Sequence, residues 1–393
     1  MPLPENIDFI INRLRSHGFR ADVVGGCVRD FLLGKEPSDY DLTTDATPEE
    51  MRFVFSDVRT LDTGIKHGTL TVLIGKCQYE ITTYRFDGEY SDNRHPDKVT
   101  FTRRLEDDLA RRDFTVNAMC YNGKDGFTDL FDGMGDLDRH IIRAVGEPKC
   151  RFTEDALRIL RAMRFSATLD FKIEENTGMA IHETKSLLTN VSSERIFVEW
   201  NKLLSGPGAY RIIKEYEDVV GIFIPELEKI TLPNEEKFTE SEAQIRELSL
   251  FALTFATQAR EKYITAMTRL KSDNKRKNFG QAVLEYFNEK TDTDTALKLL
   301  LIKAGAEYAE GILKLKILLG LSEEKEHKRL KELLKEGVCY RVSDLKINGN
   351  DLEEIGIRGR EIGTALQKLL LLTAEGKVDN ERGALLREIA KNI

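Results

Sequence analysis

The chain has 393 residues, of which 41% are hydrophobic and 32% charged, and its formal net charge of −8 corresponds to a sequence pI near 5.6. This length predicts two or three domains with a sizeable core, and the acidic balance excludes a protein that is basic all over, so any contact with nucleic acid must be a local patch. The sequence has no apolar run near the roughly 18 residues that span a membrane, no apolar leader and no closely spaced cysteines, which predicts a cytoplasmic protein with reduced thiols, no membrane contact and no evident protein partner.

The chain begins with a segment of helical periodicity. Ile7, Ile10, Ile11 and Leu14 recur at the spacing that places side chains on one face of a helix. We therefore predict an amphipathic helix over residues 5–17.

The stretch from 23 to 44, VVGGCVRDFLLGKEPSDYDLTT, combines a strand, a glycine turn, a short helix and two aspartates. Gly25 and Gly26 leave the backbone amides of the turn accessible. Asp39 and Asp41 begin a second strand, and side chains two apart on a strand share a face. Two carboxylates so close together repel each other unless a cation lies between them, and Mg²⁺ has the matching preference for oxygen. The pair therefore predicts a Mg²⁺ site.

Arg29 lies in the helix between the glycine turn and the aspartates. Backbone amides and a guanidinium beside a metal site are suited to a triphosphate. The alternative is a polar turn with two solvated aspartates, which an isolated Asp-x-Asp would favour. The GGxVRD pattern at a fixed distance before the aspartates favours the triphosphate site.

The next elements extend a small sheet. Pro48 to Phe55 predicts a helix with Thr47 as its N-cap, and 70–74 and 79–84 predict a β-hairpin. Glu80, on the second strand of this hairpin, is either a solvent-facing residue or a third carboxylate beside the aspartates. The N-terminal part of the chain is thus expected to mix strands and helices around one small sheet.

Two polar segments follow the hairpin. Residues 86–98 lack periodicity and predict a loop, which is either inert or able to move. Arg111, Arg112 and Asp113 then precede an apolar stretch, and from about Ile141 onward nearly every segment has helical period.

The most informative of these helices is predicted over 153–167, with Thr153 as its N-cap. Its apolar side chains share one face, whereas Asp155, Arg158 and Arg161 lie on the other. Asp155 and Arg158, three residues apart, are either a surface ion pair worth at most about a few tenths of a kcal/mol or a functional pair.

The rest of the chain predicts further helices. Gly206-Pro207-Gly208 ends a helix over 192–208 and marks a candidate domain boundary. Residues 209–335 predict a helical bundle, and a small terminal module follows from Val342. Within the bundle, 260–277 is strongly basic, which indicates either a solvated face or a contact with a phosphate backbone. The candidate RNA-binding residues of this segment are Arg269, Lys271, Lys275, Arg276 and Lys277.

Seven motifs follow one another along the chain. They are GGCVRD (25–30), SDYDLTT (38–44), EITTYR (80–85), RRDFTVNAM (111–119), FDGMGDLD (131–138), RFTEDALRILRAMRF (151–165) and SSERI (192–196). In this order they resemble the bacterial class II tRNA nucleotidyltransferases, the CCA-adding enzymes, and their relatives the bacterial poly(A) polymerases. The resemblance is strong over 20–205 and weaker over 345–363 and 377–386. Cys27 and Leu130 depart from the alanine and proline common in the family, and neither touches the expected chemistry.

The resemblance implies an α+β fold. An N-terminal nucleotidyltransferase palm, a small mixed sheet with helices, would be followed by all-helical neck, body and tail domains. The implied bounds are 1–140 for the head, 141–207 for a neck that recognises the base, and 208–335 and 336–393 for a body and a tail that bind tRNA.

The resemblance also implies an activity. C, C and A would be added in turn to the 3′ end of the tRNA acceptor stem from CTP and ATP, without a template, with Mg²⁺ as cofactor and pyrophosphate as product. Asp39 and Asp41 would hold the metal, with Glu80 beside them as a candidate catalytic carboxylate. The implied nucleotide-binding residues are Gly25, Gly26, Arg29, Arg112, Asp155, Arg158, Arg161 and Arg164.

Asp155 and Arg158 then acquire a hypothetical role in base selection. A carboxylate only accepts hydrogen bonds and a guanidinium only donates them. Cytosine and adenine each present an exocyclic amine beside a ring nitrogen that accepts, whereas uracil and guanine present a carbonyl beside a ring N–H. One protein pair would thus select CTP and ATP, and exchanging its two members is expected to shift preference toward UTP or GTP.

Four related activities are alternatives: addition of CC only, addition of A only, poly(A) synthesis, and RNA binding without catalysis. Poly(A) polymerases of this group tend to have Pro-Val-Arg where this chain has Ala-Leu-Arg at 156–158, and a CC-only enzyme is expected to lack the loop motif at 86–98. The intact Asp39 and Asp41 argue against a non-catalytic relative. None of the six histidines is followed by aspartate, so no metal-dependent phosphohydrolase activity is predicted.

Overall fold

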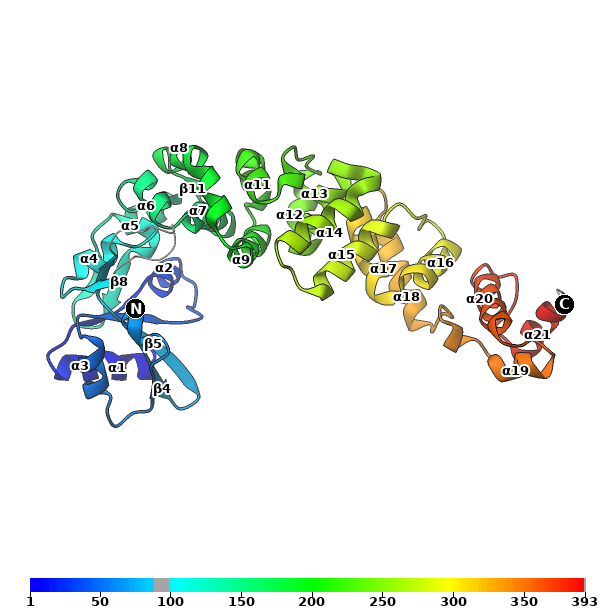
Figure 1. The fold of residues 1–393 in the computed structure, drawn as a ribbon, viewed down its shortest axis with the longest axis horizontal. Helices are drawn as coiled ribbons and strands as arrows, with labels where there is room; N and C mark the ends of the chain where they lie inside the picture. The colour runs from blue at the N-terminus through cyan, green and yellow to red at the C-terminus, as the bar shows by residue number, and fades with distance from the viewer. Residues whose placement is uncertain (88–98, 392–393) are drawn as a thin grey trace. The chain divides into compact units, whose positions relative to one another are not determined.

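The computed structural model describes residues 1–87 and 99–391. The chain forms two compact units, Met1–Pro225 and Glu226–Ile393, and strands are drawn only in the first of them (Figure 1). The glycines of Gly206-Pro207-Gly208, predicted to mark a boundary, lie inside the first unit. A Cβ on Gly206 would lie 2.3 Å from the carbonyl oxygen of Ala167, so this segment packs tightly against its neighbours and is no free linker.

One sheet of seven strands organises the N-terminal part of the first unit. Its strands are β1 (Ala21–Val24), β2 (Asp41–Thr44), β3 (Thr60–Leu61), β4 (Thr69–Ile74), β5 (Cys77–Thr83), β8 (Met119–Asn122) and β9 (Gly126–Asp129). They lie in the order β3-β4-β5-β2-β1-β8-β9. Only β2 and β5 pair in parallel within this sheet, and its other neighbours are antiparallel. The predicted small mixed sheet and the hairpin of β4 and β5 are confirmed.

The helices of this part are short. They are α1 (Glu5–Ser16), α2 (Gly26–Leu32), α3 (Pro48–Val54), α4 (Leu105–Ala110) and α5 (Gly133–Asp138), with a 3₁₀ turn, η2, at Thr115–Asn117. All four apolar residues predicted for the inner face of α1 are at most 2% exposed. Thr47 caps α3 in a reciprocal pair with Glu50, which satisfies backbone N–H groups at its start. Both helices agree with the sequence prediction.

Two pairs of short strands complete the first unit. β6 (Arg85–Asp87) pairs antiparallel with β7 (Val99–Phe101), and β10 (Ile141–Ile142) pairs in parallel with β11 (Lys172–Ile173). The loop predicted at 86–98 begins in β6, and its residues 88–98 lie outside the described residues.

Six helices follow the sheet in the first unit. They are α6 (Pro148–Glu154), α7 (Leu157–Leu169), α8 (Glu175–Thr184), α9 (Ser193–Leu204), α10 (Ala209–Glu215) and α11 (Glu217–Phe223). The single helix predicted over 153–167 is wrong, because the helix breaks at Asp155, whose backbone is extended with φ −134° and ψ 103°. The Asp155 side chain accepts the backbone N–H of Leu157 at 3.1 Å, and aspartate commonly starts a helix in this way. Thr153 lies within α6 and does not cap α7.

The second unit is helical throughout its described part, as predicted. Its helices are α12 (Glu235–Glu240), α13 (Ala243–Phe255), α14 (Ala259–Arg269), α15 (Asn274–Tyr286), α16 (Asp294–Ala304), α17 (Ala306–Leu318), α18 (Glu324–Lys335), α19 (Gly349–Glu354), α20 (Arg360–Ala374) and α21 (Arg382–Ala390). The last three surround a small core of their own that includes Leu352, Leu369 and Leu385. Within 1–87 and 99–391, none of the helices has the length and apolar character that crossing a membrane requires.

Candidate active site

Three carboxylates meet at one edge of the sheet. Asp41 is the first residue of β2, and Asp39 lies two residues before that strand begins. Leu42 of β2 pairs with Ile81 of β5, so Glu80 is the register neighbour of Asp41 in the parallel pair. Leu42 and Ile81 are buried on the core face, which leaves the three carboxylates on the opposite, exposed side.

The charge of Asp41 is destabilised where it lies. Although the residue is partly open to solvent, neighbouring protein atoms desolvate its carboxylate and raise its pKa above the ordinary value. The Asp39 carboxylate raises the pKa further, Glu80 contributes less, and Arg112 lowers it. A divalent cation between Asp39 and Asp41 would relieve this repulsion, so the donor set fits Mg²⁺. Among the described residues, no three acidic, histidine or cysteine side chains are arranged to hold a metal, so the fit rests on the two aspartates.

The glycine turn lies against Arg112. Gly25 has φ 79°, its N–H bonds to the carbonyl of Met119 at 3.1 Å, and a Cβ added to it would lie 3.2 Å from Nη1 of Arg112. The Arg112 guanidinium is fixed by the fully buried carboxylate of Asp108 at 3.1 Å. Within the described ranges, its buried Nε has no hydrogen-bond partner. An unpaired donor at this place suits an anionic ligand such as a phosphate.

Replacing Gly25 with Ala is expected to lower the rate of nucleotide transfer about tenfold, because the new methyl group would crowd Arg112 and strain a backbone, with φ 79° and ψ −128°, that residues other than glycine rarely adopt. Gly18→Ala is the matched control: Gly18 has φ 88° and nothing within 4 Å of the added Cβ. Gly25→Ala should lower the melting midpoint more than Gly18→Ala, because only its methyl group meets a neighbour, and only Gly25→Ala should lower activity. Equal loss of activity in both would contradict the role of the Gly25–Arg112 contact.

The remaining arginines lie around α7. Arg161 donates two hydrogen bonds to Asp113, at 2.8 and 2.6 Å, and Arg164 donates to Glu199 at 2.9 Å. Burial would raise the pKa of Asp113, but the charge and hydrogen bonds of Arg161 override it and hold the pKa at about 2. Arg29 donates to Asn117 at 2.7 Å and to Asp30. These guanidinium groups are therefore oriented before any ligand binds.

Asp155 and Arg158 do not pair with each other, which corrects the surface ion pair weighed from the sequence. Asp155 accepts from Arg195 of α9 at 2.9 Å. Arg158 is 8% exposed and donates to Glu154 at 2.6 Å and to the carbonyl oxygens of Arg151 and Arg111. The reason is the break in the helix at Asp155, which lies between α6 and α7, whereas Arg158 lies in the first turn of α7.

Both side chains keep capacity for a ligand. The described contacts use three of the five N–H donors of Arg158. Each carboxylate oxygen of Asp155 accepts one hydrogen bond and can accept another. Nη1 of Arg195, beside Asp155, is buried without a hydrogen-bond partner among the described residues. The pair can thus still present an acceptor and donors to a base.

Several residues that support the site were not predicted. Glu154 and Asp108 lie four residues before Arg158 and Arg112, a helical spacing that could have revealed them. Arg195 and Glu199 lie on α9, far along the chain from the groups they contact. Only the packing of α9 against α7 brings them together, and no local pattern in the sequence indicates it.

The predicted basic patch of the second unit is less open than expected. Arg276 donates to the fully buried Glu247 of α13 at 2.8 and 3.1 Å, so it supports the core of this unit and is not a free phosphate ligand. Arg269 is paired with Glu226. Lys275 is exposed and Lys277 partly so, at the start of α15, and Lys271 lies in the preceding turn with φ 53°. These lysines remain the candidates for RNA contact.

The variant Glu247→Gln is expected to destabilise the second unit by about 3 kcal/mol and to lower its melting midpoint by several degrees, because it removes the buried carboxylate charge that pairs with the partly buried Arg276. Calorimetry of the full chain measures the change. Lys275→Gln is the control and should leave the midpoint unchanged while weakening RNA binding. An unchanged midpoint for Glu247→Gln would contradict the structural assignment of this pair.

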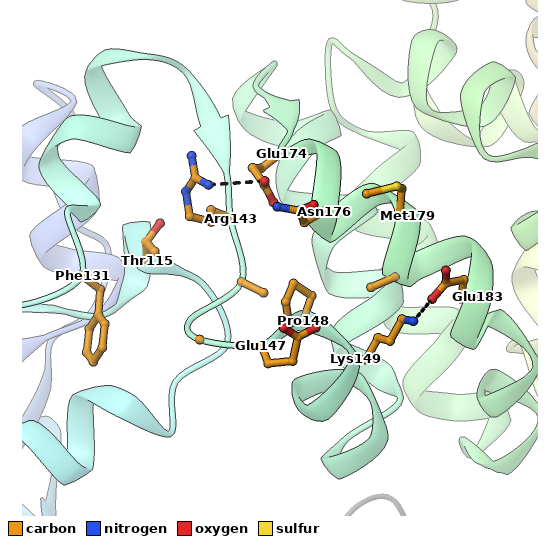
Figure 2. A pocket seen from close by; sticks show the side chains of 13 residues that line it. Thr115, Phe131, Arg143, Glu147, Pro148, Lys149, Glu174, Asn176, Met179 and Glu183 are labelled. Atoms are coloured by element: carbon orange, nitrogen blue, oxygen red, sulfur yellow. Dashed lines mark ion pairs between the residues drawn. The ribbon is translucent and has the colours of Figure 1, made fainter.

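A separate cavity of about 550 Å³ lies between the segment around Arg143 and the helices α6 and α8 (Figure 2). Four of its charged lining residues form ion pairs: Arg143 with Glu174 at 3.4 Å and Lys149 with Glu183 at 2.5 Å. None of the predicted site residues lines it. The cavity is therefore distinct from the site on the sheet edge.

Known families match nearly the whole chain. The poly A polymerase head domain matches residues 21–143, a probable RNA-binding region of polymerase A matches 170–230, and a putative second domain of tRNA nucleotidyltransferases matches 240–389. Together with the mixed sheet and its paired aspartates, these matches place the chain in the class of template-independent nucleotidyltransferases.

Similar proteins and solved structures identify the family within this class. A CCA-adding enzyme of Lactobacillus delbrueckii subsp. bulgaricus is 37% identical over 97% of this chain and 96% of its own length. A CCA-adding enzyme of Lactococcus lactis subsp. cremoris is 52% identical over 50% of this chain and 49% of its own length. The crystal structure of the Bacillus stearothermophilus CCA-adding enzyme in complex with CTP superimposes with a TM-score of 0.81 at 31% identity over the full length of both chains. The chain belongs to the CCA-adding enzymes, which are tRNA nucleotidyltransferases.

Proposed function

We propose that this chain adds C, C and A to the 3′ end of tRNA from CTP and ATP at the edge of the sheet where Asp39, Asp41, Arg112 and the glycine turn meet. The observation that carries the proposal is the placement of Asp39, Asp41 and Glu80 beside one another where β2 begins, in a site that also holds an arginine fixed by Asp108 with one buried N–H unpaired among the described residues. Carboxylates crowded in this way are suited to hold a metal, and the arginine is suited to hold a phosphate.

Different residues of the site would bind the metal and orient the triphosphate. Asp39 and Asp41 would hold Mg²⁺, which when bound neutralises phosphate charge and lowers the pKa of an attacking hydroxyl. The turn at Gly25, Arg29 and Arg112 would orient the triphosphate for in-line attack of the RNA 3′-hydroxyl on the α-phosphorus, with pyrophosphate leaving. Glu80, exposed beside Asp41, is close enough in register to add negative charge at the metal site.

The base would be read from the other side of the nucleotide. Asp155 would accept the exocyclic amine of cytosine or adenine, and Arg158 would donate to the neighbouring ring nitrogen. Arg161 and Arg164, fixed by Asp113 and Glu199, would border this side of the pocket. The lysines at 271, 275 and 277 would contact the tRNA backbone.

The proposal is tested with three RNAs: a tRNA ending before CCA, a tRNA ending in CC, and an unrelated RNA. Each is incubated with CTP, ATP or both in the presence of Mg²⁺. Addition of two C residues and then a single A to the first tRNA, and of one A to the second, is expected. Long A tails on the unrelated RNA would identify a poly(A) polymerase, and C addition alone or A addition alone would identify a partial enzyme. Deleting 88–95, which lie outside the described residues, is expected to spare C addition and impair A addition.

A further inference from the structure

The guanidinium groups of three arginines of the site lie against the ring of one phenylalanine. Phe165 of α7 is 4% exposed, and the guanidinium carbons of Arg29, Arg161 and Arg164 lie 5.2, 5.3 and 3.4 Å from the centroid of its ring. Arg29 belongs to α2, whereas the other two belong to α7. The ring face attracts cations, so Phe165 joins the arginine assigned to the triphosphate to those on the base side.

A chain of hydrogen bonds makes the same connection. Arg29 donates to Oδ1 of Asn117 at 2.7 Å, and Nδ2 of Asn117 donates to Oδ1 of Asp113 at 3.2 Å. The other oxygen of Asp113 accepts both bonds from Arg161. Asn117 lies at the end of η2 and is 7% exposed. The path thus runs from α2 through η2 to α7 without a gap.

The chemistry of this path requires an amide in the middle. The amide of Asn117 offers an acceptor to the Arg29 cation and a donor to the Asp113 carboxylate. An aspartate at 117 would face the Asp113 carboxylate directly, and an alanine would leave Arg29 without its neutral partner. The alanine would remove the bond to Arg29, whereas the aspartate would keep that bond and lose the one to Asp113, so either change uncouples Arg29 from α7.

We infer that Asn117 is a positioning residue that couples the triphosphate side of the nucleotide site to the base side. This inference rests on the proposed function, because it takes Arg29 as a phosphate ligand and α7 as the carrier of the base-reading residue Arg158. A base that displaces α7 would shift Arg29 through Asn117. The selection of the base and the binding of the triphosphate by Arg29 would then be coupled.

The first test is Asn117→Ala, measured by single-nucleotide addition with CTP and, in separate reactions, UTP. Losing a hydrogen bond to a charged group is expected to raise KM for CTP about tenfold and to lower the preference for CTP over UTP about tenfold, with a smaller change in kcat. A merely structural role would lower the melting midpoint and the active fraction while leaving KM and the preference unchanged.

Asn122→Ala is the matched control. Asn122 is fully buried at the end of β8 and makes the same pattern, accepting from Arg15 at 3.1 Å and donating to Asp22 at 2.5 Å. Within the described structure it contacts none of the predicted site residues. It should lower the melting midpoint without changing KM or base preference. If it changes them as much as Asn117→Ala does, the inference is wrong.

Exchanging the amide of Asn117 and the carboxylate of Asp113 provides a second test. Asn117→Asp alone should be more damaging than Asn117→Ala, because two carboxylates then meet. Asn117→Asp combined with Asp113→Asn restores a donor facing an acceptor at each step from Arg29 to Arg161, but it sacrifices the bond from the Phe114 N–H to Oδ1 of Asp113. KM and base preference should therefore recover in part relative to Asn117→Asp. No recovery in a folded double variant would overturn the inference. If the unaltered protein adds no CCA to tRNA, the proposed function is wrong, whatever the variants do.

Discussion

Replacing Asp41 with Asn is expected to lower the rate of nucleotide addition at least about 10³-fold, equivalent to about 4 kcal/mol of lost transition-state stabilisation. The amide keeps the shape of the side chain but removes the negative charge that would hold the metal against the phosphates. The same change at Asp39 should act similarly, because its carboxylate is the nearest like charge to Asp41. The measurement is single-turnover addition of CMP to a tRNA lacking CCA, at several Mg²⁺ concentrations.

The neighbouring Asp45 provides the control. It follows β2 directly, accepts the backbone N–H of Arg20 at 2.8 Å, and also has its pKa raised by burial. Asp45→Asn should cost stability but leave the Mg²⁺ dependence of the rate unchanged. The assignment of Asp41 fails if Asp41→Asn retains near-normal activity, or if both variants lose activity to the same extent.

The second large effect is expected for base selection. Asp155→Asn should lower kcat/KM for CTP and ATP about 100-fold, because the amide can turn a donor toward the exocyclic amine, and it should lower the preference for CTP over UTP by a similar factor. Asp170→Asn is its control: Asp170 follows the end of α7 and pairs with Arg211 at 3.2 Å. An unchanged CTP preference in Asp155→Asn would remove Asp155 from base recognition.

The structure also changes how the exchange of Asp155 and Arg158 must be done. An aspartate at 158 would lie beside the Glu154 carboxylate, and an arginine at 155 would lie beside Arg195. Both new contacts bring like charges together. The exchange is therefore expected to move preference toward UTP or GTP only when Glu154→Gln and Arg195→Gln accompany it, and the two-residue exchange alone should mainly lose activity and stability.

Local patterns in the sequence predicted much of the fold. The buried face of α1, the cap of α3 and the hairpin of β4 and β5 each follow from residues close together in the chain, and the structure has them where expected. The break between α6 and α7 was missed because the apolar period continues across it. The only contrary local signal is Asp155 itself, a residue that starts helices as readily as it occupies their first turn.

For the site, too, residues close together in the chain were predictable and contacts between distant segments were not. Asp39, Asp41 and the glycine turn lie in one short stretch, so their spacing alone indicated a metal and a triphosphate. The partners that fix the other side chains of the site come from distant segments. They are Asn117 for Arg29, Glu199 for Arg164 and Arg195 for Asp155. The basic run at 260–277 suggested Arg276 as an RNA contact, but its side chain pairs with the buried Glu247. A run of basic residues does not show which member turns inward to a buried carboxylate.

The hydrogen bond from the Gly25 amide to the Met119 carbonyl has a consequence for how the enzyme is made. The turn follows β1 early in the chain, but its closing partner stands at the start of β8, and β1 pairs with β8 only after all the intervening residues exist. Contacts between such distant segments form slowly. On the ribosome, both aspartates would therefore emerge well before the site can close. A nascent chain that ends before β8 would carry the two candidate metal-binding aspartates without the hydrogen bond that closes the glycine turn. We therefore expect activity to require a chain that extends through β8.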